Sequence, residues 1–191
     1  IAAMNPCPCG MYSNDPAKRK RCSCSRHARQ QYIRKVSGPL LDRIDIHLEI
    51  QPVRARDLLP ESGALGRQHS TERRDRSAAW RDRVQAARTV QFNRNPNGVT
   101  NHKLEGQALH DLVQLSGKGN ALLTRCMDQF GFSARTHTRI LRMARTLADL
   151  DGQGAVRTED LAAAIALRRA GRDTEQWLDQ QGNAPPELFS A

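Results

Sequence analysis

The sequence predicts an α+β fold that is mainly α, and three observations support this prediction. Apolar and polar residues alternate from Ile44 to Ile50, as they do in a half-buried strand. Two C-x-C pairs enclose a polar, basic loop near the start of the chain. From about Ser70 onward, apolar residues recur at helical spacing and glycines separate the segments. We therefore expect a small strand portion with a cysteine-stapled loop, followed by an all-helical part.

The composition excludes several classes of protein. The 191 residues carry 30 Lys and Arg against 20 Asp and Glu, which gives a formal net charge of +10, and only 4% are aromatic. No stretch approaches about eighteen consecutive apolar residues, and the start of the chain lacks the pattern of a secretory signal. We therefore predict a soluble, cytoplasmic protein with no membrane partner. Its excess of positive charge predicts anionic partners.

The first residues are read as the end of a buried strand. Ile1 to Met4 are mostly apolar, and the run stops at Asn5-Pro6. A second strand is predicted from Ile44 to Ile50, and prolines flank it at Pro39 and Pro52. The α/β portion is therefore expected within residues 1–60.

Between these strands lie four of the five cysteines, in two pairs with twelve residues between them: Cys7 with Cys9, and Cys22 with Cys24. A zinc ion binds four thiolates in a tetrahedron, and two short pairs that close a loop supply them with little strain. The alternatives are two disulfides, which are rare in intracellular chains, or four idle thiols. We predict a structural Zn²⁺ site at these four residues. Cys126 falls on an apolar helical face and is assigned to the core.

A linker and a basic amphipathic helix are predicted over residues 61–98, with the helix running from Ser70 to Gln91. Its inward stripe is predicted to be Trp80, Val84, Ala87 and Gln91. Three or four further helices are expected over residues 99–170, and their apolar stripes indicate a helix bundle. Residues 171–191 are polar and are predicted to form a flexible tail.

Three segments, taken in order, carry a resemblance to a known family: AAMNPCPCG at Ala2–Gly10, SGPLLDRIDIHLEI at Ser37–Ile50 and GFSARTHTRILRMARTLADL at Gly131–Leu150. Together they resemble the magnesium chelatase-related AAA+ ATPases, in particular the ComM-like bacterial branch, up to about Arg168. In that family a Walker A loop and a Walker B acid precede these segments. No G-x-x-x-x-G-K-[ST] occurs here, so the chain is expected to be the C-terminal portion of a longer protein.

The resemblance implies a fold and three nucleotide-site residues. Residues 1–60 would be the end of an AAA+ α/β core, and residues 99–170 the helical lid domain. Asn5 matches the sensor-1 Asn, which orients the attacking water. Arg43 matches the arginine finger, which reaches a neighbouring subunit's nucleotide. Arg135 matches the sensor-2 Arg of the lid, with Arg139 as a competing candidate if the register of that helix differs.

Each of these residues also has an ordinary structural interpretation. Asn5 precedes a proline and is typical of a turn. Arg43 could form an ion pair with Asp42 or Asp45, and Arg135 could be a solvated surface arginine.

The resemblance also implies a function. The longer protein would be a ring-forming motor, with a hexamer as the expected ring, that uses ATP and Mg²⁺ to act on DNA in branch migration or a helicase-type reaction. The 191-residue chain by itself is expected not to hydrolyse ATP. The alternatives are the motor subunit of a porphyrin metal chelatase and a zinc-stapled nucleic-acid-binding module. DNA contact is predicted mainly through Lys18–Arg21, and the low aromatic content argues against a stacking platform for single strands.

Overall fold

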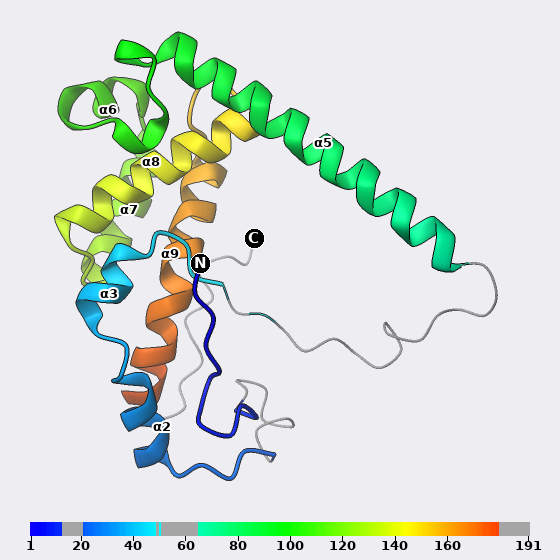
Figure 1. Cartoon of the computed structure of the whole chain (residues 1–191). Coiled ribbons are helices and arrows are strands. Elements are labelled where there is room, and N and C mark those ends of the chain that lie inside the picture. The colour runs from blue at the N-terminus through cyan, green and yellow to red at the C-terminus, as the bar shows by residue number, and fades with distance from the viewer. Residues whose placement is uncertain (13–20, 49, 51–64, 180–191) are drawn as a thin grey trace. The chain divides into compact units, whose positions relative to one another are not determined.

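The computed structural model describes residues 1–12, 21–48, 50 and 65–179. The regular structure of these residues is helical, which confirms the mainly α prediction (Figure 1). The α-helices are α2 Arg26–Ile33, α3 Gly38–Arg43, α5 Leu65–Arg94, α6 Gly106–Leu112, α7 Gly117–Phe130, α8 Ala134–Leu150 and α9 Thr158–Asp179, and the 3₁₀ turns are η1 Pro96–Gly98 and η2 Asn101–Lys103. The chain divides into two compact units, residues 1–47 with 169–191, and residues 48–168.

The two predicted strands do not form among the described residues. Residues 1–5 are irregular and exposed, and Ile46, Leu48 and Ile50 are 45%, 68% and 84% exposed. A strand forms only when a neighbouring strand pairs with its backbone N–H and C=O groups, and the described residues supply no such neighbour. The strand predictions are therefore wrong for these residues.

The first unit contains two short helices. Ser25 caps α2, because its hydroxyl oxygen accepts a hydrogen bond from the Ala28 N–H at 3.1 Å. Four residues separate α2 from α3, which has Pro39 in its first turn and Arg43 as its last residue. These two helices follow directly on the second cysteine pair.

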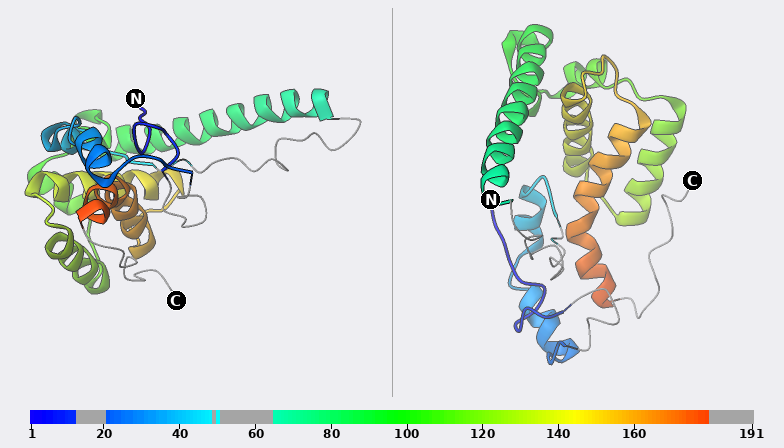
Figure 2. Two further views of the ribbon diagram at one scale, coloured as in Figure 1. Left: turned by 90° about the horizontal axis from the view of Figure 1, so that it is seen from below. Right: turned by 90° about the vertical axis from the view of Figure 1, so that its right-hand side faces the viewer.

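The basic helix α5 belongs to the second unit and is longer than predicted. It begins at Leu65, so Ser70 lies inside the helix and is not its cap. Its C-terminal part packs on α8, whereas its N-terminal part projects beyond the bundle (Figures 1 and 2). Ala87 and Gln91 are buried as expected, but Trp80 and Val84 remain 58% and 40% exposed. Only the C-terminal part of the predicted inward stripe is therefore covered by the bundle core, and its N-terminal part is left exposed.

Helices α6, α7, α8 and the start of α9 form the bundle core of the second unit. Their apolar stripes are buried as predicted, and Cys126 lies in this core with 1% of its surface exposed. Ser116 and Ser133 cap the N-termini of α7 and α8, and the C-cap of α7 is Gly131, whose φ of +57° suits a residue without a side chain. Helix α9 continues to Asp179, beyond the position where the flexible tail was predicted to begin. No helix of the described residues is long and apolar enough to cross a membrane.

A buried polar cluster joins α5, η2 and α8. The Asp149 carboxylate accepts hydrogen bonds from Arg94, from Asn101 at 2.7 Å and from Arg145 at 3.1 Å. The Asp149 and Arg145 side chains are 0% and 1% exposed. Arg145 also donates to the carbonyls of Gln153 and Gly154, so this cluster fixes the loop between α8 and α9.

Candidate metal centre and nucleotide-site residues

The two cysteine pairs converge in the first unit. Cys7, Cys9, Cys22 and Cys24 are free thiols, and their sulfur atoms all lie within 4.8 Å of one another. The Cys7 sulfur lies 3.3 Å from that of Cys9 and 3.8 Å from that of Cys22, and the Cys9 and Cys22 sulfurs are 3.6 Å apart. A tetrahedral ion with metal–sulfur bonds of about 2.3 Å needs sulfurs about 3.8 Å apart. The cluster therefore has the ligand type, number and spacing of a tetrathiolate metal site.

Backbone N–H groups surround these sulfurs and alter their pKa values. A hydrogen bond from the Met11 N–H, assisted by the Cys7 thiol, lowers the pKa of Cys9 to about 6. Burial raises the pKa of Cys7 although the Tyr12 N–H donates to its sulfur. The Cys9 N–H acts to lower the pKa of Cys24, but burial and the neighbouring thiols outweigh it and raise that pKa to about 11. Because a metal binds thiolates, filling this site would release the protons that these thiols hold.

A tight turn shapes the first pair. The Gly10 N–H donates to the Cys7 carbonyl at 3.0 Å, and Gly10 has a φ of +74°, which favours glycine. A Cβ at Gly10 would lie 3.5 Å from the amide nitrogen of Asn5. Asn5, the predicted sensor-1 residue, is exposed and lies beside this turn.

Arg29, on α2, connects the two cysteine pairs. Its guanidinium donates to the Cys24 carbonyl at 2.6 Å and lies 4.7 Å from the centre of the Tyr12 ring. Tyr12 is buried and follows the first pair by three residues. Arg29 therefore contacts both Tyr12, which follows the first cysteine pair, and Cys24 of the second pair.

The predicted DNA-contacting residues fall mostly outside the described residues. Lys18, Arg19 and Lys20 lie in the part of the loop that the structure does not describe, and Arg21 is exposed.

Arg43, the predicted arginine finger, ends α3 with an exposed side chain. Its guanidinium donates to the Pro39 carbonyl of its own helix at 3.2 Å. Among the described side chains no carboxylate pairs with Arg43, so the alternative ion pair with Asp45 does not form. The Asp42 side chain is outside the described set.

Arg135, the predicted sensor-2 residue, is exposed in the first turn of α8. The Ser133 hydroxyl accepts a hydrogen bond from the Thr136 N–H at 3.2 Å, so Ser133 caps this helix. Arg139 lies one turn further along and is half-buried. Asn5 and Arg43 belong to the first unit, and Arg135 belongs to the second.

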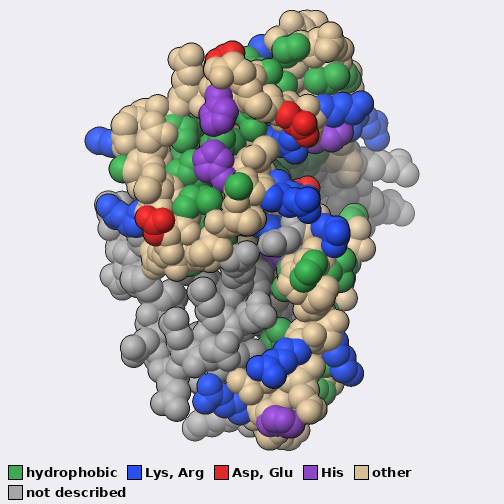
Figure 3. Space-filling view, turned by 90° about the vertical axis from the view of Figure 1, so that its left-hand side faces the viewer, with side chains coloured by type: hydrophobic (Ala, Val, Ile, Leu, Met, Phe, Trp, Pro, Cys, Tyr) green, Lys and Arg blue, Asp and Glu red, His purple; other side chains and the backbone are tan. Residues whose placement is uncertain are grey.

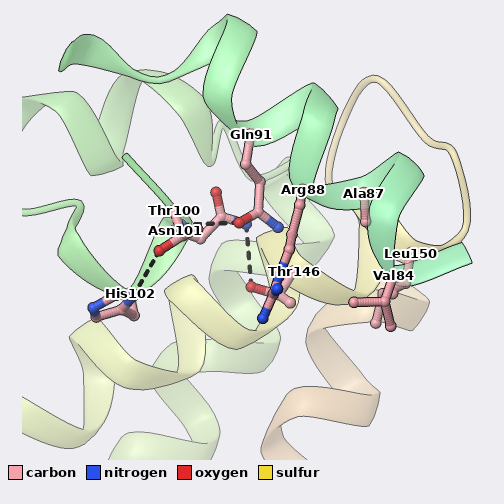
Figure 4. Close-up of a pocket in the computed structure, with 9 residues that line it drawn as sticks. All are labelled: Val84, Ala87, Arg88, Gln91, Thr100, Asn101, His102, Thr146 and Leu150. Atoms are coloured by element: carbon pink, nitrogen blue, oxygen red, sulfur yellow. Dashed lines mark hydrogen bonds between the residues drawn. The ribbon is translucent and has the colours of Figure 1, made fainter. Parts of the chain in front are cut away.

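A shallow cavity of about 260 Å³ lies between α5, η2 and α8, and the sequence analysis did not predict it (Figure 4). Val84, Ala87 and Leu150 form its apolar part, whereas Arg88 and His102 bring cationic or hydrogen-bonding groups to it. Trp80 lies one turn before Val84 on α5. The only sequence signal for this surface was the stripe that we assigned to the core.

Comparison with known proteins gives matches over most of the chain. The sequence model of the family described as "Magnesium chelatase, subunit ChlI" matches residues 1–58, and that described as "Magnesium chelatase, subunit ChlI C-terminal" matches residues 74–168. The chain is 33% identical to the competence protein ComM of Haemophilus influenzae over 168 residues, which are 88% of this chain and 30% of ComM. It is 32% identical to the uncharacterized protein YifB of Escherichia coli over 172 residues, 90% of this chain and 31% of YifB.

An uncharacterized protein of Mycobacterium tuberculosis is 31% identical over 173 residues, again 90% of this chain and 31% of the relative. These matches define a protein of the magnesium chelatase ChlI type. Within that class, the chain belongs to the ComM-like magnesium chelatase-related family. It spans about three-tenths of the length of the relatives that it matches.

Proposed function

We propose that this chain is the C-terminal part of a ring-forming AAA+ ATPase that acts on DNA, in branch migration or a helicase-type reaction. The observation that carries the proposal is the family match on both sides of the linker, over residues 1–58 and 74–168. The relative named as a competence protein supports DNA as the substrate. In this proposal, residues 1–60 complete an AAA+ core and residues 99–170 form its lid.

Three exposed residues have the nucleotide roles in this proposal. Asn5 orients the attacking water, and Arg43 neutralises the charge that develops on the phosphates of a neighbouring subunit's nucleotide. Arg135 reaches the nucleotide of its own subunit from the start of α8. Arg43 is exposed at the last residue of α3 and pairs with no carboxylate among the described residues, so its charge is open to a neighbouring subunit's nucleotide once its hydrogen bond to the Pro39 carbonyl is given up. ATP and Mg²⁺ would be bound mainly by other parts of the longer protein.

The cysteine cluster is proposed to hold one structural Zn²⁺. Four thiolates fill a tetrahedral zinc ion completely, which leaves no open position for a substrate. When bound, the ion would supply cross-linking of the loop, and no catalysis. Arg29, Tyr12 and the turn at Gly10 position the four ligands.

The test is ATP hydrolysis by the longer protein with and without DNA. DNA should stimulate turnover, and Arg43→Ala should abolish turnover while nucleotide binding is largely retained. The 191-residue chain alone should show no turnover. If DNA has no effect while a porphyrin-binding partner stimulates hydrolysis, the chelatase-motor alternative holds and the DNA proposal fails.

A further inference from the structure

Trp80 is held in place on α5 although it is largely exposed. Its side chain is 58% exposed, and the Arg83 guanidinium lies 5.1 Å from the centre of its ring. Arg83 is itself anchored, because it donates to the Leu150 carbonyl at 2.7 Å and forms an ion pair with Asp151. The C-terminal end of α8 therefore supports an arginine that in turn supports an exposed indole ring.

This support lowers the cost of using the ring as a binding surface. A side chain that is already fixed loses little conformational freedom when a ligand contacts it. The contact with Arg83 occupies part of the Trp80 side chain, and more than half of it remains open to a second flat partner.

The surface continues along α5 at four-residue spacing. Val84 and Arg88 follow Trp80 by one and two turns, so the three residues extend over about 12 Å of the helix axis. Val84 and Arg88 line the cavity between α5 and α8, and His102 lies at its other side (Figure 4). The acidic residue Asp82 is two residues from Trp80, which places it about 200° around the helix and away from this face.

The charge of this surface favours a polyanion over a protein helix. Arg88 is exposed and has no ion-pair partner among the described residues, and the nearby Asp149 and Asp151 are already paired with arginines. The chain as a whole carries a net charge of +10. Figure 3 shows the side of the molecule that is at the left of Figure 1, and there too Lys and Arg side chains (blue) are spread with few acidic ones (red) among them. A supported aromatic ring and an unpaired cation on the same face of one helix can bind a base and a phosphate of a single strand.

We propose that the face formed by Trp80, Val84 and Arg88 binds a single strand of nucleic acid, with one base stacked on Trp80 and a backbone phosphate at Arg88. A duplex cannot stack a base on Trp80 in this way, because its bases are already stacked on one another. DNA as the particular nucleic acid rests on the proposed function. The low aromatic content of the chain does not oppose this inference, because one supported tryptophan is enough to stack one base.

The experiment uses the 191-residue chain with Trp177→Phe, so that Trp80 is the only tryptophan. An oligothymidylate strand should quench the Trp80 fluorescence. In anisotropy measurements with a labelled strand, Trp80→Ala should weaken affinity roughly 5- to 150-fold, and Trp80→Phe should retain part of the affinity. Arg88→Gln should lower the slope of log affinity against log salt by about 0.7, the value for one phosphate of a single strand.

Two controls separate this surface from the rest of the chain. Val90 is 47% exposed on another side of α5, and Val90→Ala should leave affinity unchanged. Lys118→Gln, on α7, should leave the salt slope unchanged. Circular dichroism and thermal unfolding check that each variant folds.

Four results would overturn the inference. Unchanged affinity in Trp80→Ala, without quenching, would move the strand to another surface and leave the proposed function intact. Equal affinity for a blunt duplex with the same Trp80 dependence would exclude stacking on an unpaired base. Self-association that Trp80→Ala abolishes would identify a protein partner instead. If no strand binds at low salt, this surface is not a nucleic-acid site. The proposed function would still be tested separately, by DNA-stimulated ATP hydrolysis in the longer protein.

Discussion

Replacing Asp149 should be among the most destabilising single changes in the second unit. The Asp149 carboxylate accepts four hydrogen bonds, two of them from Arg94. Without it, the guanidinium of Arg145, which is 1% exposed, would be left as a buried charge that has lost the carboxylate it pairs with. Breaking a buried pair by removing one partner costs about 3–5 kcal/mol. For a chain of this size, that predicts a fall in the unfolding midpoint of about 6–20 °C.

The assay is thermal unfolding followed by circular dichroism, with Asp149→Ala, the isosteric Asp149→Asn and the control Asp128→Asn. Asp128 is an exposed acid on α7, so its replacement should have little effect. Asp149→Asn keeps the shape and loses the charge, and we expect it to be clearly destabilised but to fold. If Asp149→Asn unfolds at the same temperature as Asp128→Asn, the carboxylate does not hold the cluster together and the reasoning is wrong.

The same cluster predicts a dependence of stability on pH. Burial by itself would raise the pKa of Asp149, but hydrogen bonds from Arg94 and Asn101 and the charge of Arg145 hold it below its ordinary 3.8. A carboxyl whose pKa is lowered by folding stabilises the native state above its unfolded pKa, and this stabilisation is lost as the pH falls through the folded value. The unfolding temperature of the wild type should therefore decrease as the pH is lowered below about 3.8. The decrease should be smaller in Asp149→Asn, which has no carboxyl group to protonate at this position.

The remaining predictions concern the first unit and the nucleotide site. Arg29→Met should weaken zinc binding roughly 10- to 100-fold in competition with a chromophoric chelator, whereas Arg34→Met, on the same segment, should not; equal affinities would deny Arg29 its positioning role. In the longer protein, Arg43→Ala should lose turnover but not nucleotide binding, and an equal loss of both would mark Arg43 as structural. Replacing Lys18–Arg21 with alanine should lower the salt slope of duplex DNA binding by about three to four, and an unchanged slope at preserved zinc content would contradict a DNA contact there.

Local sequence patterns predicted the helical unit well. The stripes of α7 and α8 repeat at helical spacing, and serines stand at their caps, so short-range chemistry determines where these helices begin. The convergence of the four cysteine sulfurs was also predicted, because two matched C-x-C pairs are typical of residues that share one metal ion. Whether the sulfurs hold zinc stays a prediction.

Features that depend on distant partners could not be read from the sequence. Alternation from Ile44 to Ile50 predicted a strand, but a strand requires a neighbour that no local pattern supplies. Arg145 and Asp149 both lie on the buried side of α8, but the other partners of Asp149, Arg94 and Asn101, lie some fifty residues earlier in the sequence. Trp80 was assigned to the core because spacing shows which side of a helix is apolar but not where the neighbouring helices end.

The two units differ in what can stabilise them. In the second, apolar side chains from α6 through α9 bury one another, and the Asp149 cluster satisfies the charges at their edge. In the described residues 1–47, only Cys7, Tyr12 and Ile33 are buried, which is far too little apolar surface to offset the entropy of ordering the chain. A small unit of this kind needs a cross-link, a metal ion or a surrounding protein surface. The four sulfurs give the first unit a candidate metal site, so we predict that its order depends on a bound ion to a degree that the second unit's does not.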